Sequence, residues 1–568
     1  MIDNIIFFLY NLGEVFMKKQ LIILMAGRAT RLAPLSLFLP KGLLTINQKP
    51  ACFNMVADLI ANHDVDDITF VTSPSNNQIV KDFVNKSFSG TKGLKINFVI
   101  QENPAGPLHA FQLCESLIHE PTLLLLGDTL CETELDYSYD WVGYKTINDN
   151  SHSRWCLIKT DADEVLTQII DKPEYTPETN KVLIGLYNFV NYKDLVDCLN
   201  KDYPRIRNEL QLSSLIWEYS QLHSVKGMQI NNWYDTGTLK DYNETLANNI
   251  SGRSFNKFRL DKFGVLTKES SYLKLKTEID WIKEVSKRGY AFLMPNFYGE
   301  KIEKKNGEEI VSYKIEYVNG KTLTEYFNYY QISPDNWCYI FDRLINTMSV
   351  LWENIPSKQF DIVKNSRYMY VEKTLERIAK WGRKDILEQE YIFSNGEKLL
   401  GFYSVFDKLK DKIERLINSS EKYASIIHGD PCFSNVIFFP ETGSFKLIDP
   451  RGNFGEDSIY GDKRYDVAKL RHNYHGLYDN IVLNLFKLKE IANNEFEYDF
   501  FSKDILSPSI FDQILKNYGF DLSEIELIEG LLFISMIPLH ENNKKAQIMF
   551  YLTGIKCLNN QLKRINEK

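Results

Sequence analysis

The chain has 568 residues, of which 44% are hydrophobic and 25% charged, and its formal net charge is −8 at pH 7. This composition excludes a disordered, collagen-like or disulfide-scaffold protein, and the acidic balance argues against a nucleic-acid partner. At roughly 100–200 residues per domain, the length predicts two or more domains. The first segment, residues 1–16, holds a short apolar run that is neither a membrane span nor a signal peptide. We interpret it as an N-terminal extension or a non-native start.

Residues 17–250 alternate short apolar runs with amphipathic stretches. This alternation predicts an α/β domain with a doubly wound, mixed and mostly parallel sheet. The predicted strands are Leu21–Met25, Ile68–Thr72, Ile96–Gln101, Thr122–Leu126 and Val182–Val190, and the predicted helices include Ala51–Ala61 and Leu108–Leu117.

A polar, turn-rich stretch at 248–254 predicts a domain boundary near residue 250. Residues 251 to about 320 look strand-like around one helix, Leu275–Val285. From about 321 to 568 the pattern is mostly helical, except for a predicted hairpin of Asn435–Phe439 and Ser444–Asp449. None of the eight cysteines forms a C-x-x-C pair, which favours reduced thiols in a cytoplasmic protein. No later run is long and apolar enough to predict a membrane span.

The first predicted strand runs into a loop of small residues, Ala26-Gly27, followed by Arg31 and by Pro40-Lys41. Small residues let backbone N–H groups approach a triphosphate, and arginine and lysine side chains neutralise its charge. The loop therefore predicts a nucleotide-phosphate site.

Six further elements follow along this half. They are Gln101–Ala110, Leu126-Gly127-Asp128, Asp171-Lys172-Pro173, Gly185-Leu186-Tyr187, Asn208–Leu212 and Trp233–Thr238. Together with the loop, and in this order, they resemble the sugar-phosphate nucleotidyltransferase family, which has a Rossmann-like fold. The chain departs from the family pattern at Ala29, where glycine is usual, and at Asp171, where glutamate is usual.

The resemblance implies a role for each element. The side chains of Arg31 and Lys41 would neutralise the triphosphate, and Lys172 would bind the incoming phosphate monoester. The nucleotide would be bound at Ala26, Gly27, Gln101 and Gly106, the acceptor at Gly185 and Glu209, and Mg²⁺ at Asp128 and Asp235.

A second constellation begins at His428-Gly429-Asp430 and continues with Asn435 and Asp449. Phosphoryl transfer needs these parts: a carboxylate that accepts the acceptor's hydroxyl proton, and oxygen ligands that hold Mg²⁺ on the nucleotide. The spacing resembles the aminoglycoside phosphotransferase and choline kinase superfamily, a variant of the protein-kinase fold. A bilobal α+β domain is therefore expected, with Asp430 as catalytic base and Asn435 and Asp449 as Mg²⁺ ligands.

In the smaller lobe, the resemblance implies that Lys268 reaches the phosphates of ATP and pairs with Glu278 on the following helix. Lys274 and Lys276 are competing candidates for this lysine. Glu316 would begin the segment that meets adenine through backbone groups. Asp466, beyond the metal-binding Asp449, is expected to brace the catalytic loop rather than to act chemically.

A kinase makes a phosphate monoester and a nucleotidyltransferase consumes one. We therefore expect a bifunctional enzyme that phosphorylates a small sugar or polyol with ATP. It would then transfer a nucleoside monophosphate from a second NTP (CTP, UTP or dTTP), releasing pyrophosphate and making a donor for a bacterial surface glycan such as a capsule. One alternative is choline or ethanolamine as acceptor, giving a CDP-linked product. Another is a regulatory or scaffold protein with one inactive half. The oligomeric state is left open.

Overall fold

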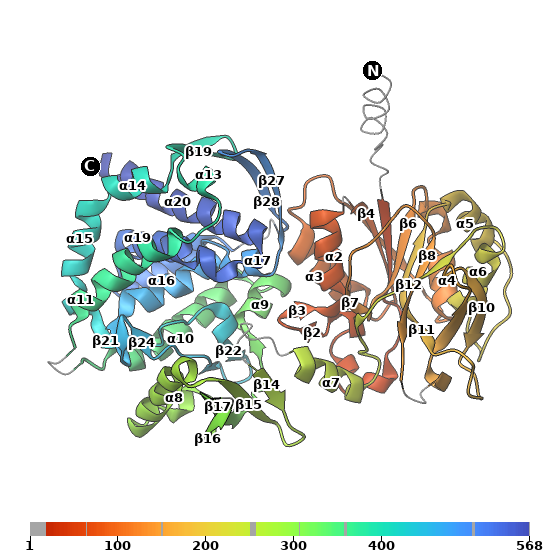
Figure 1. Ribbon diagram of the computed structural model, residues 1–568, viewed down its shortest axis with the longest axis horizontal. Helices are drawn as coiled ribbons and strands as arrows, with labels where there is room; N and C mark the ends of the chain where they lie inside the picture. Colours follow the sequence, from red (N-terminus) through yellow and green to blue (C-terminus); the bar gives the residue numbers. More distant parts are fainter. Residues whose placement is uncertain are drawn as a thin grey trace. The chain divides into compact units, whose positions relative to one another are not determined.

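The computed structural model describes residues 19–63, 65–148, 152–249, 257–305, 307–356, 360–502 and 506–566. The predicted extension, residues 1–16, and the predicted boundary near residue 250 lie outside these ranges. The chain divides into two compact units, Met1–Val84 with Lys92–Asn249, and Asn85–Thr91 with Ile250–Lys568 (Figure 1). None of the described helices combines the length and the apolar character that crossing a bilayer requires.

The first unit is built on a mixed sheet whose main path runs β10-β9-β11-β6-β1-β4-β5, with β8 beside β11 and β12 beside β8. Strands β5, β4, β1 and β6 are parallel, and β11 is antiparallel to β6. This confirms the predicted α/β fold for this half. The bounds are β1 (Lys19–Leu24), β4 (Val65–Thr72), β5 (Lys95–Ile100), β6 (Thr122–Leu126), β8 (Trp141–Thr146), β9 (Cys156–Thr160), β10 (Leu166–Asp171), β11 (Lys181–Phe189) and β12 (Lys226–Gln229).

The central strands are apolar on both faces because the sheet is covered on both sides. Leu21, Ile22 and Ile23 of β1 are fully buried. The helices are α2 (Ala51–Asn62), α3 (Asn77–Phe88), α4 (Pro107–Gln112), α5 (Tyr192–Leu199), α6 (Leu212–Ser220) and α7 (Leu239–Asn249), and two short ribbons are β2 (Thr45–Ile46) with β3 (Lys49–Pro50) and β7 (Leu130–Glu132) with β13 (Asn232–Tyr234).

The predicted helix Leu108–Leu117 is wrong in its second half. Helix α4 ends at Gln112, and a separate 3₁₀ turn covers Glu115–Leu117. The N–H of Cys114 bonds to the carbonyl of Phe111 at 2.9 Å. The backbone has therefore already tightened to the i→i+3 pattern that typically ends a helix.

The second unit begins with an antiparallel sheet of order β14-β15-β17-β16. Its strands are β14 (Lys257–Leu260), β15 (Val265–Ser271), β16 (Phe297–Lys305) and β17 (Glu308–Glu316), and helix α8 (Tyr272–Lys287) follows β15 directly. The predicted helix Leu275–Val285 lies within α8. Trp281 of α8 is fully buried and donates from its indole nitrogen to the carbonyl of Ile427 at 2.7 Å.

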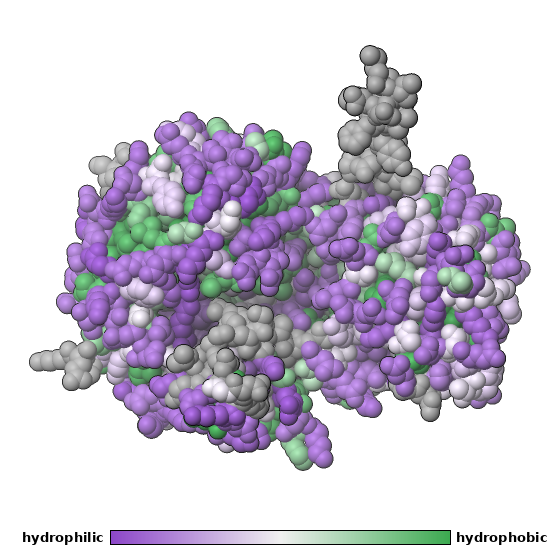
Figure 2. All heavy atoms as spheres, viewed as in Figure 1, coloured by the Kyte–Doolittle hydropathy of each residue, from purple (hydrophilic) through white to green (hydrophobic). Residues whose placement is uncertain are grey.

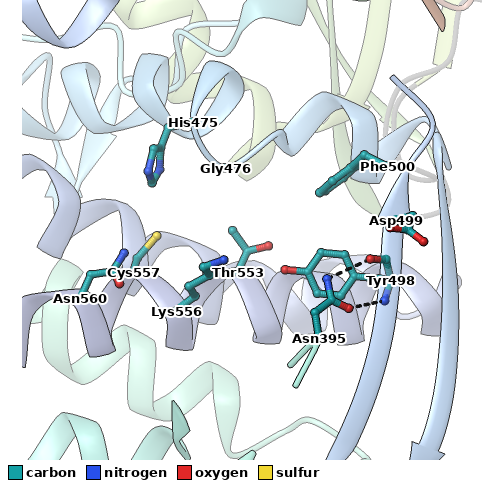
Figure 3. A pocket seen from close by; sticks show the side chains of 10 residues that line it. All are labelled: Asn395, His475, Gly476, Tyr498, Asp499, Phe500, Thr553, Lys556, Cys557 and Asn560. Atoms are coloured by element: carbon teal, nitrogen blue, oxygen red, sulfur yellow. Dashed lines mark hydrogen bonds between the residues drawn. The ribbon is translucent and has the colours of Figure 1, made fainter. Parts of the chain in front are cut away.

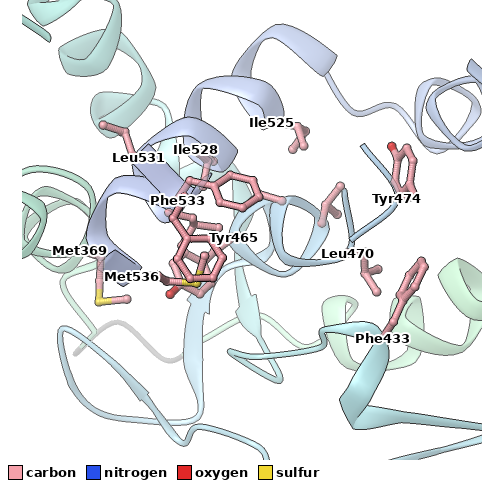
Figure 4. Close-up of a cluster of buried hydrophobic side chains, with 14 of the residues drawn as sticks. Met369, Phe433, Tyr465, Leu470, Tyr474, Ile525, Ile528, Leu531, Phe533 and Met536 are labelled. Atoms are coloured by element: carbon pink, nitrogen blue, oxygen red, sulfur yellow. The ribbon is translucent and has the colours of Figure 1, made fainter. Parts of the chain in front are cut away.

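Helices form most of the remaining structure. They are α9 (Leu323–Tyr329), α10 (Pro334–Trp352), α11 (Ile362–Arg367), α12 (Lys373–Ile378), α13 (Lys384–Leu387), α14 (Phe402–Lys408), α15 (Lys410–Asn418), α16 (Lys463–Tyr474), α17 (Tyr478–Val482), α18 (Pro508–Asn517), α19 (Leu522–Met536) and α20 (Lys544–Asn566). From Ile525 to Met536, α19 is buried on every side. It lies in the cluster of apolar side chains drawn in Figure 4.

The β structure of this region is more extensive than predicted. The expected hairpin is present as β22 (Val436–Phe439) and β23 (Ser444–Leu447), and β18 (Lys321–Thr322) pairs with β22. Short ribbons join β21 (Ala424–Ile426) to β26 (Tyr460–Asp462) and β24 (Asn453–Phe454) to β25 (Glu456–Asp457).

A further four-stranded sheet, of order β20-β19-β28-β27, contradicts the expectation that only one β region interrupts the helices. Its strands are β19 (Tyr391–Ser394), β20 (Glu397–Leu400), β27 (Phe486–Ala492) and β28 (Glu495–Phe500). Strands β27 and β28 are mostly exposed and rich in lysine and glutamate, residues depleted in strands, so they resemble a helix surface in the sequence.

Polar side chains also cover most of the face seen in Figure 2.

Candidate active sites

In the first unit, the loop after β1 leaves the sheet at the carboxyl ends of the parallel strands, where ligands of α/β proteins typically bind. The N–H of Met25 donates to the carbonyl of Val71, the next strand's end, at 2.7 Å. Ala26 is buried, whereas Gly27 is exposed with open space beside its Cα. Arg31 is exposed on the 3₁₀ turn that follows. The loop thus presents its backbone groups and the side chain of Arg31 at this edge of the sheet.

Ala29 occupies the left-handed backbone region in this loop, with φ 48°. This conformation costs an L-residue about 1–2 kcal/mol and costs glycine little, which explains why glycine is usual here. Glycine relieves this strain, but it also makes the unfolded chain more flexible, which offsets part of the gain. We therefore expect Ala29→Gly to raise the free energy of unfolding by about 0.5–1 kcal/mol. The shift should be visible in urea unfolding of the full chain.

The matched control is Ala33→Gly, in the same loop at φ −56°. No strain is relieved there, so this change should lower stability by about 0.4–1 kcal/mol. Equal losses for the two variants would contradict the strain at Ala29.

Lys41 and Asp128 are brought together by two glycines. A Cβ on Gly42 would collide with the carbonyl oxygen of Gly127, so the two backbones can pack closely only because position 42 is glycine. Gly127 in turn donates its N–H to the carbonyl of Leu24 at the end of β1. The amine of Lys41 then contacts the carboxylate of Asp128 directly.

Asp235 lies at the same place, in the loop between β13 and α7. Its Oδ1 accepts the N–H of Gly237 at 2.7 Å, and its Oδ2 lies 3.0 Å from Nη2 of Arg154. Burial lowers the pKa of Lys41 to about 8, although Asp235 counteracts this shift. Burial also raises the pKa of Asp235. A pair of partly buried carboxylates facing one lysine fits the hard oxygen ligands that Mg²⁺ prefers.

The sequence analysis missed Arg154 and Asp241. Nη2 of Arg154 bridges Asp235 and Asp241, at 3.0 and 2.6 Å. Thr238, three residues before Asp241, accepts the N–H of that residue at 3.1 Å. The Thr-x-x-Asp pattern could have predicted this helix start, but no local signal links Arg154 to it.

The stretch at Gln101–Gly106 folds against the segment at 209–210. Leu210 donates its N–H to the carbonyl of Ala105 at 2.8 Å and accepts from Leu108 at 3.0 Å. Gly106 has φ 109°, and a Cβ there would lie 2.5 Å from the carbonyl oxygen of Leu210. Gln101 donates to the carbonyl of Gly106 at 3.0 Å. The structure therefore brings Gln101, Gly106 and Glu209 together.

Gly185 and Lys172 also depend on special backbone geometry. Gly185 has φ 86°, and a Cβ there would lie 2.7 Å from side-chain atoms of Leu126 and Thr129, which flank Asp128 in sequence. Lys172 has φ 46°, and its N–H donates to the carbonyl of Trp155 at 2.8 Å. Arg207 donates to the carbonyl of Lys172 at 3.1 Å, so this turn is held by its backbone.

In the second unit, Lys268 of β15 forms the predicted ion pair with Glu278 of α8. Its amine lies 2.9 and 2.8 Å from the two carboxylate oxygens of Glu278 and 3.0 Å from Oδ1 of Asp449. Burial alone would lower the pKa of Lys268, but the carboxylates of Asp449 and Glu278 raise it above its usual value. Lys276, a competing candidate, instead pairs with Asp280 at 2.7 Å, and the side chain of Lys274 is not among those described.

Gly452 ties helix α8 to the segment that carries Asp449. A Cβ on Gly452 would collide with the carbonyl oxygen of Thr277, the neighbour of Glu278. The hydroxyl of Thr277 donates to the carbonyl of Arg451 at 3.0 Å. Asp449 itself has φ 56°. Close packing therefore fixes Lys268, Glu278 and Asp449 as one group.

The predicted catalytic loop is braced from behind by Asp466 of α16. Its carboxylate accepts the N–H groups of His428 and Gly429, both at 2.8 Å, and the indole N–H of Trp352 at 3.2 Å. These contacts are those of a positioning residue. His428 is fully buried, and burial lowers its pKa to about 4, so it is neutral near pH 7.

The side chain of Asn435 contacts the loop that carries Asp430. Its Nδ2 donates to the carbonyl of Asp430 at 2.9 Å, which leaves the carbonyl oxygen of the amide for a cation. With the carboxylate of Asp449, the donor set is again oxygen only and fits Mg²⁺. Lys469, which the sequence analysis did not single out, lies with its amine 3.0 Å from Oδ1 of Asp430.

Glu316 is the last residue of β17. Its N–H donates to the carbonyl of Asn296 at 2.9 Å, and the next N–H, of Tyr317, donates to Gly264 at 2.8 Å. A side-chain oxygen of Glu316 accepts from the N–H of Asn296 at 3.2 Å. These two N–H groups are therefore already engaged within the protein.

A cavity of about 400 Å³ lies elsewhere in the second unit, where His475 faces Cys557 and Asn560 of α20 (Figure 3). Ligand atoms of His475, Cys557 and Glu529 lie within 4.8 Å of one another. Glu529, however, is already paired with Arg471 and with His475. Its charge is compensated, and we assign no metal to this cluster.

The fold of the first unit is that of a Rossmann-like α/β nucleotidyltransferase domain. Residues 20–251 match the family model described as Nucleotidyl transferase. The chain is 26% identical over 236 residues to the bifunctional protein GlmU of Methanococcus aeolicus, covering 40% of this chain and 54% of that protein. It is also 26% identical over 243 residues to the UTP–glucose-1-phosphate uridylyltransferase AglF of Haloferax volcanii, covering 40% and 94%.

The chain thus spans about half the length of the GlmU relatives that it matches. Among solved structures, a UDP-glucose pyrophosphorylase complexed with UDP-glucose is 22% identical, with a TM-score of 0.36, and covers 40% of this chain and 97% of that one. A UDP-glucose pyrophosphorylase from Acinetobacter baumanii is 18% identical, with a TM-score of 0.35, and covers 41% and 93%.

Proposed function

We propose that the chain is a bifunctional enzyme. Its second half phosphorylates a small hydroxylated acceptor with ATP, and its first half transfers a nucleoside monophosphate from a second NTP to the resulting phosphate monoester. The observation that carries the proposal is the presence of two complete sets of phosphate-handling residues in one chain. Lys41, Asp128 and Asp235 form the first set.

The second set is Lys268, Asp430, Asn435 and Asp449. With Glu278 paired to Lys268 and Asp466 bracing the loop, every position that the kinase reaction needs is filled. This speaks against a regulatory or scaffold protein with one inactive half.

In the nucleotidyltransferase half, an oxygen of the monoester attacks the α-phosphorus of the NTP, and the bond to pyrophosphate breaks. The attacking oxygen is already ionised, so no general base is required. Arg31 and Lys41 neutralise the triphosphate, and Lys172 positions the monoester. Asp128 and Asp235 would hold Mg²⁺, which supplies charge neutralisation at the α-phosphate. The backbone at Ala26 and Gly27, and at Gln101 and Gly106, binds the nucleotide, and Gly185 and Glu209 border the acceptor.

In the kinase half, the acceptor hydroxyl attacks the γ-phosphorus of ATP. A new oxygen–phosphorus bond forms, the bond to the β-phosphate oxygen breaks, and ADP leaves. Asp430 accepts the hydroxyl proton. Lys268, held by Glu278, neutralises the nucleotide phosphates, and the segment that begins at Glu316 receives the adenine. Asn435 and Asp449 would hold Mg²⁺, which supplies charge neutralisation between the β- and γ-phosphates.

The two reactions fit in series, because the first product is the second substrate. We take a sugar or polyol as the acceptor, since the printed names of relatives include glucose-1-phosphate uridylyltransferase and a low-salt glycan biosynthesis nucleotidyltransferase. The second NTP would be CTP, UTP or dTTP, and the product would serve surface glycan synthesis. Choline or ethanolamine is the alternative acceptor.

The test is product analysis with the full chain. A panel of acceptors is incubated with ATP and each of the four common NTPs, and ADP, pyrophosphate and the product mass are measured. We expect ADP and pyrophosphate to form in equal amounts, and the product to contain both groups. Pyrophosphate formed only from a supplied phosphate monoester, with no ADP from any acceptor, would refute the kinase half.

A further inference from the structure

Cations gather around the proposed catalytic base, Asp430. Lys469 is only 5% exposed, and its amine lies 3.0 Å from Asp430 and 3.5 Å from the sulfur of Met536. A buried lysine costs stability unless it is paired. Lys469 is therefore paired with Asp430, and any other cation near this carboxylate shares it with Lys469.

Two further cations have no carboxylate partner among the residues that the structure describes. The amine of Lys373, at the start of α12, lies 3.3 Å from the sulfur of Met369. The guanidinium of Arg451 donates to the hydroxyl of Tyr465 at 2.7 Å. Met369 and Tyr465 belong to the buried cluster shown in Figure 4. Both cations therefore lie at the edge of an apolar core, while remaining partly exposed.

Packing links the two cations to the loop that carries Asp430. The N–H of Arg451 donates to the carbonyl of His428 at 2.8 Å, and Tyr370, three residues before Lys373, stacks on Tyr465, to which Arg451 donates. Burial is the main cause that lowers the pKa of Lys373 to about 6, and Arg451, Arg377 and Lys469 lower it further, whereas Asp430 raises it. With this pKa, Lys373 is mostly neutral near pH 7 in the free protein, and a bound anion would raise the pKa and restore the charge.

The charges that act most strongly on Lys373 differ from those that act on Lys268. The charges that act on Lys268 are those of Asp449 and Glu278. Those that act on Lys373 are Arg451, Arg377, Lys469 and Asp430. Only the second group includes Asp430, the carboxylate that faces the acceptor hydroxyl in the proposed reaction.

A buried histidine near the same carboxylate is also without a partner. His472 is fully buried, and neither of its ring nitrogens has a hydrogen-bond partner. Lys469 and Asp430 are the charges that act on it. Buried polar groups are normally satisfied, so the surroundings of Asp430 hold one unused hydrogen-bonding group as well as unpaired cations.

We propose that the acceptor of the kinase half is an anion: a hydroxylated molecule that also bears a carboxylate or a phosphate, bound by Lys373 and Arg451 beside Asp430. This inference rests on the proposed kinase function and names its substrate class. It disfavours choline and ethanolamine, whose positive charge would meet Lys373, Arg377 and Arg451.

The test compares acceptors that differ only in the charged group: glucuronate with glucose, and glycerate and glycerol phosphate with glycerol. Choline and ethanolamine complete the panel, and ADP formation is followed with the full chain. We expect the anionic members to exceed their neutral partners at least about tenfold in kcat/KM. Glycerate against glycerol phosphate then distinguishes a carboxylate from a phosphate acceptor.

Lys373→Gln should raise KM for the anionic acceptor about 10–100-fold, the value of one or two charge-assisted hydrogen bonds. It should narrow the preference for the anionic acceptor over its neutral partner, and Lys373→Arg should restore most of the loss. Lys380→Gln, at an exposed position beyond the end of α12, is the matched control.

Three results would overturn the inference. Neutral or cationic acceptors as good as the anionic ones would refute it while leaving the kinase in place. A rise in KM for ATP in Lys373→Gln would assign the cations to the nucleotide. The absence of ADP with every acceptor would refute the kinase function and the inference with it.

Discussion

Asp430→Asn is expected to lower ADP formation by about 10²–10⁴-fold, the contribution of a positioned general base. The amide keeps the size of the side chain but cannot accept the hydroxyl proton. It also loses the charge that faces Lys469, 3.0 Å away. The measurement is ADP release at saturating ATP and acceptor. KM for ATP should change little, because Lys268 and Asp449 remain.

The same protein provides its own control. Nucleotidyl transfer from a supplied monoester should proceed at the wild-type rate, since the first unit is unaltered. Asp411→Asn, at an exposed position on α15, should leave both activities unchanged. If Asp430→Asn silenced both reactions, two separate active sites would be the wrong description.

Asp128→Asn should have the opposite effect. Losing one of two carboxylates that hold Mg²⁺ removes several kcal/mol of charge stabilisation, about a 10³-fold loss of pyrophosphate release. The variant also frees Lys41 from its carboxylate partner, so added Mg²⁺ should restore only part of the rate. Pyrophosphate release is measured with a supplied monoester and each NTP.

ADP formation should be unaffected by Asp128→Asn. Asp163→Asn, on an exposed turn of the same unit, is the matched control and should keep full pyrophosphate release. Wild-type pyrophosphate release in Asp128→Asn would remove this residue from the proposed metal site.

The predictable parts are those where local sequence carries the information. The apolar run of β1 and the small residues after it predict a strand and loop, and both are present. The order of motifs places Asp128 and Asp235 in one site, and the structure brings each of them near Lys41. The choice of Lys268 over Lys276 also agrees with the ion pairs, because Lys268 pairs with Glu278 whereas Lys276 pairs with Asp280. Lys268 lies in the middle of β15, not at its end.

The remainder depends on contacts between distant segments. Arg154 reaches Asp235 and Asp241 across the fold, and Lys373 reaches the surroundings of Asp430 from another helix. No sequence pattern near Arg154 or Lys373 predicts these contacts. The sheet of β27 and β28 was missed for a different reason: its charged, exposed strands resemble the outer face of a helix, and tertiary pairing outweighs local propensity.

The close packing at Gly452 has a consequence for control of the proposed kinase activity. Many enzymes of phosphoryl transfer are switched by swinging the glutamate-bearing helix away from its lysine. Here the bond from Thr277 to Arg451 and the contact at Gly452 fasten that helix to the segment that bears Asp449. We therefore expect the lysine, the glutamate and the aspartate to stay together when the protein moves. Output from this half should follow the supply of acceptor and ATP rather than an on–off switch.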